Sequence, residues 1–136
     1  MMRPALVWTD TALRFGVDRQ QVQAVVRSPE LSPVPLAPAW LVGVINRFGR
    51  AVAVVDVGLL AGLKAGSHPT QQVVIVEGSW GELGVALAET PTDELYGPLA
   101  AGEGLFDAVS VPVGLRLISP EGLARSLSTK LGAPHA

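Results

Sequence analysis

Cysteine is absent from this chain of 136 residues, which excludes several kinds of site at once. Without a thiol there is no disulfide framework, no cysteine nucleophile and no zinc site that uses cysteine. Histidine is nearly as scarce, since the chain has two. His68 lies in a polar segment and His135 next to the last residue, and neither has partners at the spacing of a metal site or a nucleophile and base. We therefore expect solvated loop histidines, with no metal, no cofactor and no catalytic residue.

Charge and long apolar runs are also lacking. The net charge of −2 offers no general attraction to nucleic acid or anionic membrane, and no acidic residues are paired for acid and base work. Apolar runs such as "AVAVV" are far shorter than the ~18 residues needed to cross a bilayer. The first ten residues, "MMRPALVWTD", are too short on apolar residues for a secretory signal. We expect a soluble cytoplasmic protein without a nucleic-acid partner or membrane insertion.

The chain does contain many short strand patterns. "ALVWT" and "ALRFGV" around "DT" predict a hairpin, and "VVIVE" and "LGVALAE" around "GSWG" predict another. "LFDAVSVPV" and "LRLIS" add two strands. "SPEGLARSLSTKL" predicts a helix over about residues 120–131, with Ser119 as N-cap and Pro120 at the first helical position. The pattern is typical of a mainly β protein with a short C-terminal helix.

The sequence predicts the conformation of residues 28–38 but leaves that of the preceding valine-rich segment open. Val22, Val25 and Val26 stand at spacings of three and four, which fits one side of a helix, yet their β-branched side chains favour a strand. Both interpretations remain open. Residues 28–38 carry four prolines, which predicts an extended connector; the PxxP spacing inside it also fits an SH3-type ligand, which we favour less.

The stretch "LVGVINRFGRAVAVVDV" begins at Leu41 and places two arginines and a phenylalanine between two apolar runs. Residues 41–45 and 51–55 are apolar at odd and even positions alike, so both faces of each strand must be covered, as in a closed barrel or between packed layers. We expect both strands to be interior. Asp56 fits the N-cap of the short segment "VGLLAGL" better than a catalytic role, because no basic or nucleophilic partner lies near it in the sequence.

A longer stretch, "VQAVVRSPELSPVPLAPAWLVGVINRFGRAVAVVDVGLLAGL", resembles the heart of the CheW-like coupling domain found in chemotaxis scaffold proteins and histidine kinases. In that family a valine-rich element leads into a connector of the type "plPnaP" and two strands of the types "GvinlRG" and "viPVvDL". The likeness covers about forty contiguous positions, so it is more specific than a lone short motif. The counterparts here are Val22, Val25, Val26, Pro35, Pro38, Gly43, Val44, Ile45, Asn46, Gly49, Val54, Val55 and Asp56.

The resemblance implies a fold of two small five-stranded β-barrels around a shared core, followed by the short C-terminal helix. The first barrel would cover mainly residues 12–66 and the second mainly residues 71–120. The polar segment 64–72, "KAGSHPTQQ", would then be the boundary between them.

The resemblance also implies a non-catalytic adaptor that links the cytoplasmic tip of a methyl-accepting chemoreceptor to a CheA-type histidine kinase. The receptor would bind in the groove between the barrels, and barrel ends would meet the kinase. The three valines also fit as core residues, and a small-ligand-binding β-barrel or an enzyme with an unrecognised pocket remains the alternative function. The expected partner-binding residues are Val22, Val25, Val26, Gly43, Val44, Asn46, Arg47, Phe48, Gly49 and Arg50.

The chain departs from the family pattern in three places. Residues 90–113 are shorter than expected, and Leu87 and Ala88 stand where relatives tend to carry "VD". The arginine of the family's "NLRG" falls at Phe48, with arginines on either side. We therefore expect a divergent adaptor that keeps the receptor contact and has a weakened or absent kinase contact, although Phe48 also fits as a cover for the end of the first barrel.

Overall fold

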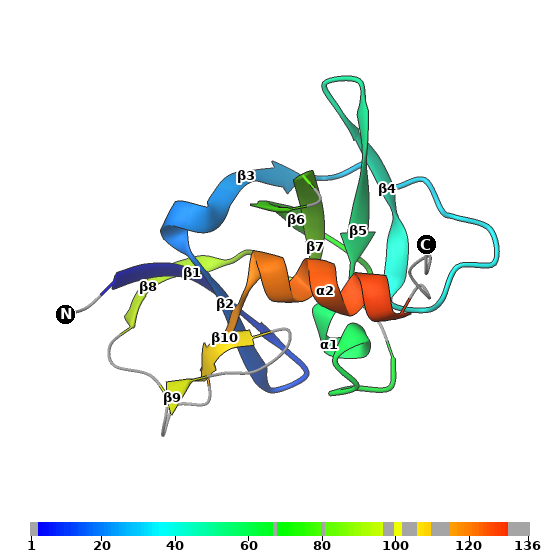
Figure 1. Ribbon diagram of the computed structural model, residues 1–136. Helices are drawn as coiled ribbons and strands as arrows, with labels where there is room; N and C mark the ends of the chain where they lie inside the picture. Colours follow the sequence, from blue (N-terminus) through cyan, green and yellow to red (C-terminus); the bar gives the residue numbers. More distant parts are fainter. Residues whose placement is uncertain are drawn as a thin grey trace.

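The computed structural model describes residues 3–66, 68–79, 81–96, 100–101, 106–109 and 115–130. Most of these residues lie in strands (Figure 1). In chain order the elements are β1 (Arg3–Asp10), β2 (Leu13–Asp18), the 3-10 turn η1 (Arg19–Gln21), β3 (Val22–Arg27), β4 (Leu41–Arg47), β5 (Arg50–Val55), α1 (Val57–Leu60), β6 (Gln72–Gly78), β7 (Gly81–Leu87), β8 (Thr92–Tyr96), β9 (Ala100–Ala101), β10 (Phe106–Val109), β11 (Leu115–Ile118) and α2 (Pro120–Lys130).

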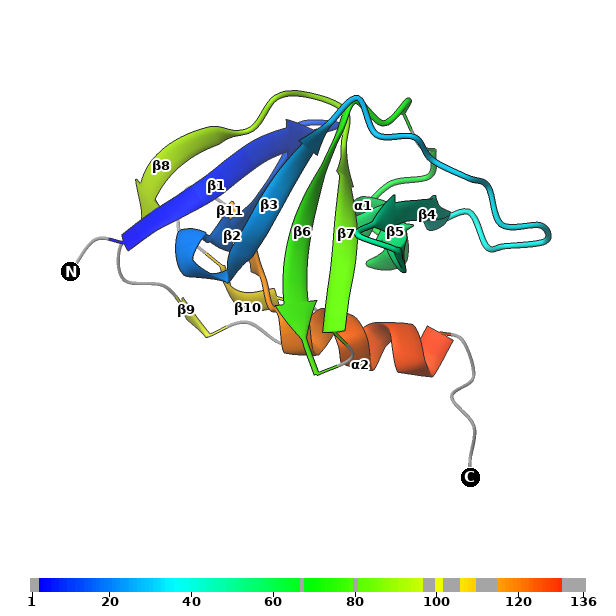
Figure 2. The ribbon, with the colours of Figure 1, turned by 90° about the horizontal axis from the view of Figure 1, so that it is seen from above.

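The strands form two sheets. One sheet, which we call the terminal sheet, combines strands from the N-terminal and C-terminal parts of the chain in the order β8-β1-β2-β11-β10-β9. The other, which we call the middle sheet, has the order β3-β6-β7-β5-β4. Helix α2 packs chiefly against β6. Figures 1 and 2 show α2 lying alongside the sheets. The expected class, mainly β with a short C-terminal helix, is confirmed.

The expected pair of closed five-stranded barrels needs correction. The described strands form open sheets of six and five strands, and the polar segment 64–72 does not separate them. Strands β6 and β7, which follow that segment, belong to the same sheet as β3, β4 and β5. The N-terminal hairpin instead pairs with the C-terminal strands, through a parallel β2–β11 contact. A polar loop marks a chain reversal, and the reversal here returns to the same sheet.

Strand β6 shows how the cores are arranged. Val74 and Val76 enter a central core shared by the two sheets and α2, whereas Val73 and Ile75 enter a second core on the other face of the middle sheet. All four side chains are fully buried. Because successive side chains point to opposite faces, this strand needs an apolar layer on each side. A third core, which contains Ala5 and Leu117, lies on the other face of the terminal sheet.

Several local predictions are confirmed. The β1–β2 and β6–β7 hairpins form as expected, with direct pairing up to Asp10 and Leu13 in the first and up to Gly78 and Gly81 in the second. Residue 80 in the second turn lies outside the described residues, as do Leu131 and His135.

The valine-rich segment is a strand, which resolves the open choice between helix and strand. A bulge between Val22 and Ala24 shifts the register of β3 against β6. Val22 and Val25 consequently pack against the central core, and Ala24 and Val26 against the second core. The bulge inserts an extra residue, which accounts for the helix-like spacing of three.

Strands β4 and β5 differ in their position. β5 is interior, as expected, but β4 is the edge strand of the middle sheet. The connector 28–40 covers part of that edge, because Ser32 and Val44 exchange two backbone hydrogen bonds of 2.9 Å. Figure 2 shows the connector looping out between β3 and β4. The expectation that both strands are interior is therefore correct for β5 and wrong for β4.

Both predicted N-caps are confirmed. The carboxylate of Asp56 accepts a hydrogen bond of 3.1 Å from the backbone N–H of Leu59, at the start of α1. The hydroxyl of Ser119 accepts one of 3.0 Å from the N–H of Gly122, at the start of α2. Each cap satisfies a backbone donor that has no partner within its helix.

A buried lysine joins the two sheets. The ammonium of Lys64 lies 2.5 Å from a carboxylate oxygen of Asp10, at the end of β1, and 2.9 Å from one of Asp56, after β5. Its side chain is 5% exposed and passes over Gly58, which has no Cβ to obstruct it. Burial acts to lower the pKa of Lys64, but the hydrogen bonds and charges of the two aspartates outweigh it and raise the pKa. The lysine thus stays charged and bridges the sheets.

We predict that Lys64→Met destabilises the protein by about 3 kcal/mol in urea denaturation, because it leaves two buried carboxylates without their cation. Lys130→Met, at the exposed end of α2, is the matched control and should change stability by less than about 0.5 kcal/mol. Because the pKa of Lys64 is raised in the folded protein, its contribution is complete below the pKa of an unfolded lysine and is lost as the pH rises through the folded-state value. Equal stabilities of the two variants would show that the bridge adds nothing.

Candidate interaction surface

The β4–β5 hairpin extends beyond the rest of the middle sheet. β5 pairs with β7 at Val54 and Val55, so residues 46–51 project past that contact as a two-stranded arm, visible at the top of Figure 1. We call these residues the arm. Phe48 and Gly49 form its turn with φ values of 52° and 83°, and the side-chain oxygen of Asn46 accepts a hydrogen bond of 2.9 Å from the N–H of Gly49. Two successive left-handed residues match the twist of a two-residue hairpin.

An ion pair links the arm to β7. The guanidinium of Arg47 makes two hydrogen bonds to the carboxylate of Glu82, 3.0 Å from Nε and 3.1 Å from Nη2. The same guanidinium lies 4.9 Å from the centroid of the Phe48 ring, within the range of a cation–π contact. The two-point geometry fixes the orientation of the guanidinium plane.

Arg47 and Glu82 each shift the pKa of the other toward the charged form. Hydrogen bonds from Arg47 hold the pKa of Glu82 below its ordinary value, against the opposing effect of burial, and the positive charges of Arg47 and Arg50 add to the shift. The bonds to Glu82 in turn raise the pKa of Arg47. A lowered carboxylate pKa means that the pair is complete above the pKa of an unfolded glutamate and is lost as the pH falls through the folded-state value. The arm is therefore tied to β7 at neutral pH.

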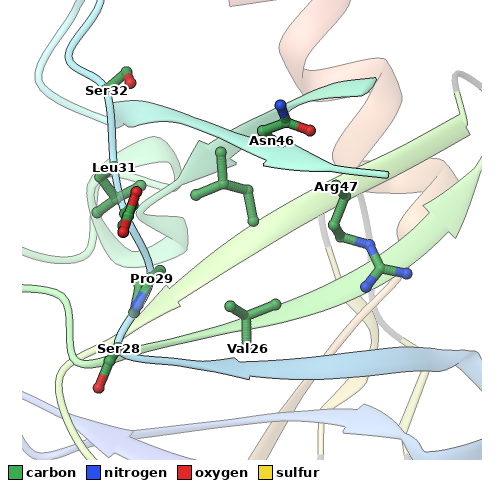
Figure 3. Close-up of a pocket in the computed structure, with 9 residues that line it drawn as sticks. Val26, Ser28, Pro29, Leu31, Ser32, Asn46 and Arg47 are labelled. Carbon is green, nitrogen blue, oxygen red and sulfur yellow. The ribbon is translucent and has the colours of Figure 1, made fainter. Parts of the chain in front are cut away.

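A cavity of about 490 Å³ lies between the two edge strands of the middle sheet. β3 and β4 approach each other because the sheet curls around the second core, which receives side chains from both. Figure 3 shows Val26 below the space, Leu31 on the connector beside it, and the side chain of Arg47 reaching down from β4. The lining residues are Val26, Ser28, Pro29, Glu30, Leu31, Ser32, Ile45, Asn46 and Arg47.

The ten expected partner-binding residues occupy four different environments. Val22 and Val25 are half-buried against the central core, whereas Val26 lines the cavity. Gly43 is buried beneath the connector, beside Val44. The other five belong to the arm: Asn46, Arg47, Phe48, Gly49 and Arg50. Of these, Asn46 and Arg47 also line the cavity.

Gly43 lies against the protein's own backbone. A Cβ on Gly43 would lie 2.8 Å from the carbonyl oxygen of Ser32. Glycine at this position therefore allows the connector to pair with β4, which closes one side of the cavity.

Sequence reasoning missed Glu82, Leu31 and Glu30. Glu82 is 35 residues from its partner Arg47, and no local pattern joins them. Leu31 and Glu30 stand in the proline-rich connector, which has no periodic pattern from which the direction of a side chain could be predicted. In the described ranges no three histidine, aspartate or glutamate side chains gather as a metal site. His68 is exposed, beside the Lys64 bridge.

An unpaired sheet edge can accept a strand of another protein, and an apolar groove can accept a helix. A family model described as a CheW-like domain matches residues 9–92, more than half of the chain, and the chain therefore belongs to the CheW-like domain family. Members of this family are non-catalytic scaffold proteins. The resemblance noted in the sequence to this domain family is thereby confirmed.

Two known proteins illustrate the relationship. The chain is similar to the chemotaxis protein CheW of Thermotoga maritima, with 26% identity over 102 aligned residues. The alignment covers 75% of this chain and 63% of that protein. It thus spans less than two thirds of that relative's length. The crystal structure of scaffolding protein TtCheW from Thermoanaerobacter tengcongensis superposes with a TM-score of 0.71 at 19% identity, covering 90% of this chain and 92% of that one. The latter likeness establishes the fold. Among the described residues no helix is long and apolar enough to cross a membrane.

We predict that Gly43→Ala destabilises the protein by about 1–3 kcal/mol, because the added methyl displaces the connector from β4. Gly66→Ala is the matched control: no atom lies within 4 Å of its Cβ position, and its stability should be unchanged or slightly higher. Chemical denaturation of both variants gives the comparison. Equal midpoints would mean that the connector yields without cost.

Proposed function

We propose that this chain is an adaptor that couples the cytoplasmic tip of a chemoreceptor to a histidine kinase. The observation that carries the proposal is the match of the CheW-like domain to residues 9–92, which include the valine strand, the connector and the arm. The names of the two similar proteins, a chemotaxis protein and a scaffolding protein, support it. The proposed place of action is the cytoplasm, where the partner domains lie.

The receptor contact is proposed at the cavity between β3 and β4 and at the surface around it. Val26 and Leu31 supply apolar area there, and the serines, Asn46 and Glu30 supply polar groups at its rim. An apolar hollow with a polar rim is the chemistry that receives one face of an amphipathic helix. Val22 and Val25 support this surface from the core side, because they already pack inward.

The kinase contact is proposed to be weaker than in relatives that carry an arginine at the turn. A guanidinium makes charge-assisted hydrogen bonds that a phenyl ring cannot replace. Arg47 is engaged by Glu82, so it is not a simple substitute for the missing arginine. A kinase surface shaped for arginine would therefore meet an exposed ring at Phe48.

Titration calorimetry with the receptor's cytoplasmic tip and, separately, with the kinase's regulatory domain tests this proposal. We expect measurable receptor binding. A kinase that ordinarily pairs with an arginine-bearing relative should bind this chain about 10-fold more weakly than it binds that relative. Phe48→Arg should recover part of that difference.

Each result has a definite meaning. Binding to neither partner would reject the adaptor function. Kinase binding as tight as that of the arginine-bearing relative would reject the weakened contact while leaving the adaptor intact. A small molecule that binds tightly in the cavity would favour the alternative of a ligand-binding β protein, because the cavity volume falls in the range of such sites.

A further inference from the structure

We infer that the groove between α1 and α2 receives one helix of a further partner protein, and that this helix carries an apolar stripe flanked by carboxylates. The inference goes beyond the proposed receptor and kinase contacts, because the groove shares no residue with the cavity between β3 and β4 or with the arm. It follows from the shape of the groove, from the way α2 is held, and from the charges at the rim.

The groove is a hollow of about 380 Å³ between the end of α1 and the later turns of α2, which Figure 1 shows beside each other. Its α1 wall is apolar and consists of Leu60 and Ala61. On the α2 wall, Gly122, Ser126 and Thr129 follow one another at spacings of four and three, so they share one face of the helix. That face is about two turns long. Helices pack by inserting the side chains of one into the grooves of another, so a helix fits this trough.

A different set of side chains holds α2 on the sheets. Leu123, Ala124 and Leu127 are buried in the central core, so the groove face of the helix remains for another contact. The hydroxyl of Thr129 donates a hydrogen bond of 3.1 Å to the carbonyl oxygen of Arg125 in the same helix. A partner that covers this hydroxyl therefore leaves no unsatisfied donor behind.

Arg125 and Lys130 give the groove its positive charge. Both are exposed and line it, and neither forms an ion pair with another residue in the part of the chain that the structure describes. No acidic side chain is among the described residues that line the groove, although the whole chain has a net charge of −2. Charges at the rim of an interface select a partner of opposite sign. Carboxylates beside the apolar stripe of the incoming helix supply that sign.

The same charges disfavour two other occupants. In the described ranges α2 is the only helix longer than α1, and its charged residues are Glu121, Arg125 and Lys130, one negative and two positive. A second copy would therefore offer the groove a helix of net positive charge. An anionic membrane is usually bound by clusters of roughly four or more lysines and arginines, and this groove has two.

The test uses the full-length chain and two synthetic peptides of about 18 residues, long enough to form a helix. The acidic peptide has leucine and alanine on one face and glutamate on the others, and the basic peptide has lysine in place of each glutamate. Fluorescence anisotropy should give a Kd of about 10–100 µM for the acidic peptide and binding at least about 10-fold weaker for the basic one. In NMR titrations the acidic peptide should shift amides of α2 and of the end of α1.

Two matched pairs of variants locate the contact. Arg125→Glu should weaken binding of the acidic peptide by about 5- to 10-fold. Arg27→Glu makes the same change of net charge at an exposed arginine of β3 and should alter the affinity by less than about twofold. Ser126→Phe should block the groove, whereas Ser126→Ala should leave binding intact. Thermal melting checks that each variant is folded, and Arg125→Glu decides the question if Ser126→Phe is not.

Several results would overturn the inference. One is the absence of acidic-peptide binding, and another is equal affinity of Arg125→Glu and the wild type. Binding that appears only in Leu131→Ser would assign the groove to the chain's own C-terminal residues. Loss of binding to phosphatidylserine-containing vesicles in Arg125→Glu, without any peptide binding, would assign it to a membrane surface. A saturating receptor tip should change the peptide's affinity by less than about twofold, because the proposed surfaces are separate, and competition between the two would place the peptide at the receptor surface instead.

Discussion

Burial of both faces of the same strands is the constraint on which the rest of this structure depends. Neighbouring residues of β6 point to opposite sides and are all fully buried, so the middle sheet must have an apolar layer on each face. The terminal sheet and α2 provide one layer. The other comes from the middle sheet itself, which curls until β3 and β4, at its two edges, contribute to a common core. A single rule of side-chain alternation thus produces both the pairing of sheets and the curl.

The curl also determines the surface. Because β3 and β4 approach without pairing among the described residues, the space between them remains as a cavity, and the connector occupies only the part where Ser32 pairs with Val44. The β4–β5 hairpin is longer than the stretch of β5 that pairs with β7, so its end projects. Arg47 then reaches across from the projecting end to Glu82. The cavity and the arm therefore both follow from the incomplete strand pairing of the middle sheet: its edges β3 and β4 do not pair with each other in the described residues, and β5 pairs with β7 over only part of its length.

The sequence was sufficient for structure that depends on near neighbours. The hairpins and the caps at Asp56 and Ser119 follow from residues within a few positions of one another, and the structure confirms them. The contacts that it could not show join distant residues: Lys64 meets an aspartate 54 positions away, and Arg47 a glutamate 35 positions away. The prediction of which strands share a sheet was wrong for a similar reason. A polar loop shows that the chain reverses direction, but not which strand the following strand pairs with. The spacing of Val22 and Val25 was ambiguous because a bulge gives a strand the spacing of a helix.

The arm shows why a departure from a family pattern carries information that the pattern itself does not. The residues around the turn stabilise the hairpin. The Asn46 side chain accepts a hydrogen bond from the N–H of Gly49, Gly49 adopts the left-handed backbone that the turn requires, and Arg47 binds Glu82 on β7. Each of these would work equally well with a small polar residue at Phe48. The fold tolerates Phe48 at a conformational cost, and the ring lies 4.9 Å from the guanidinium of Arg47 while it remains 91% exposed. The sequence thus serves two separate structural features: alternation of apolar side chains builds the cores, and the strained turn leaves one aromatic ring exposed to solvent.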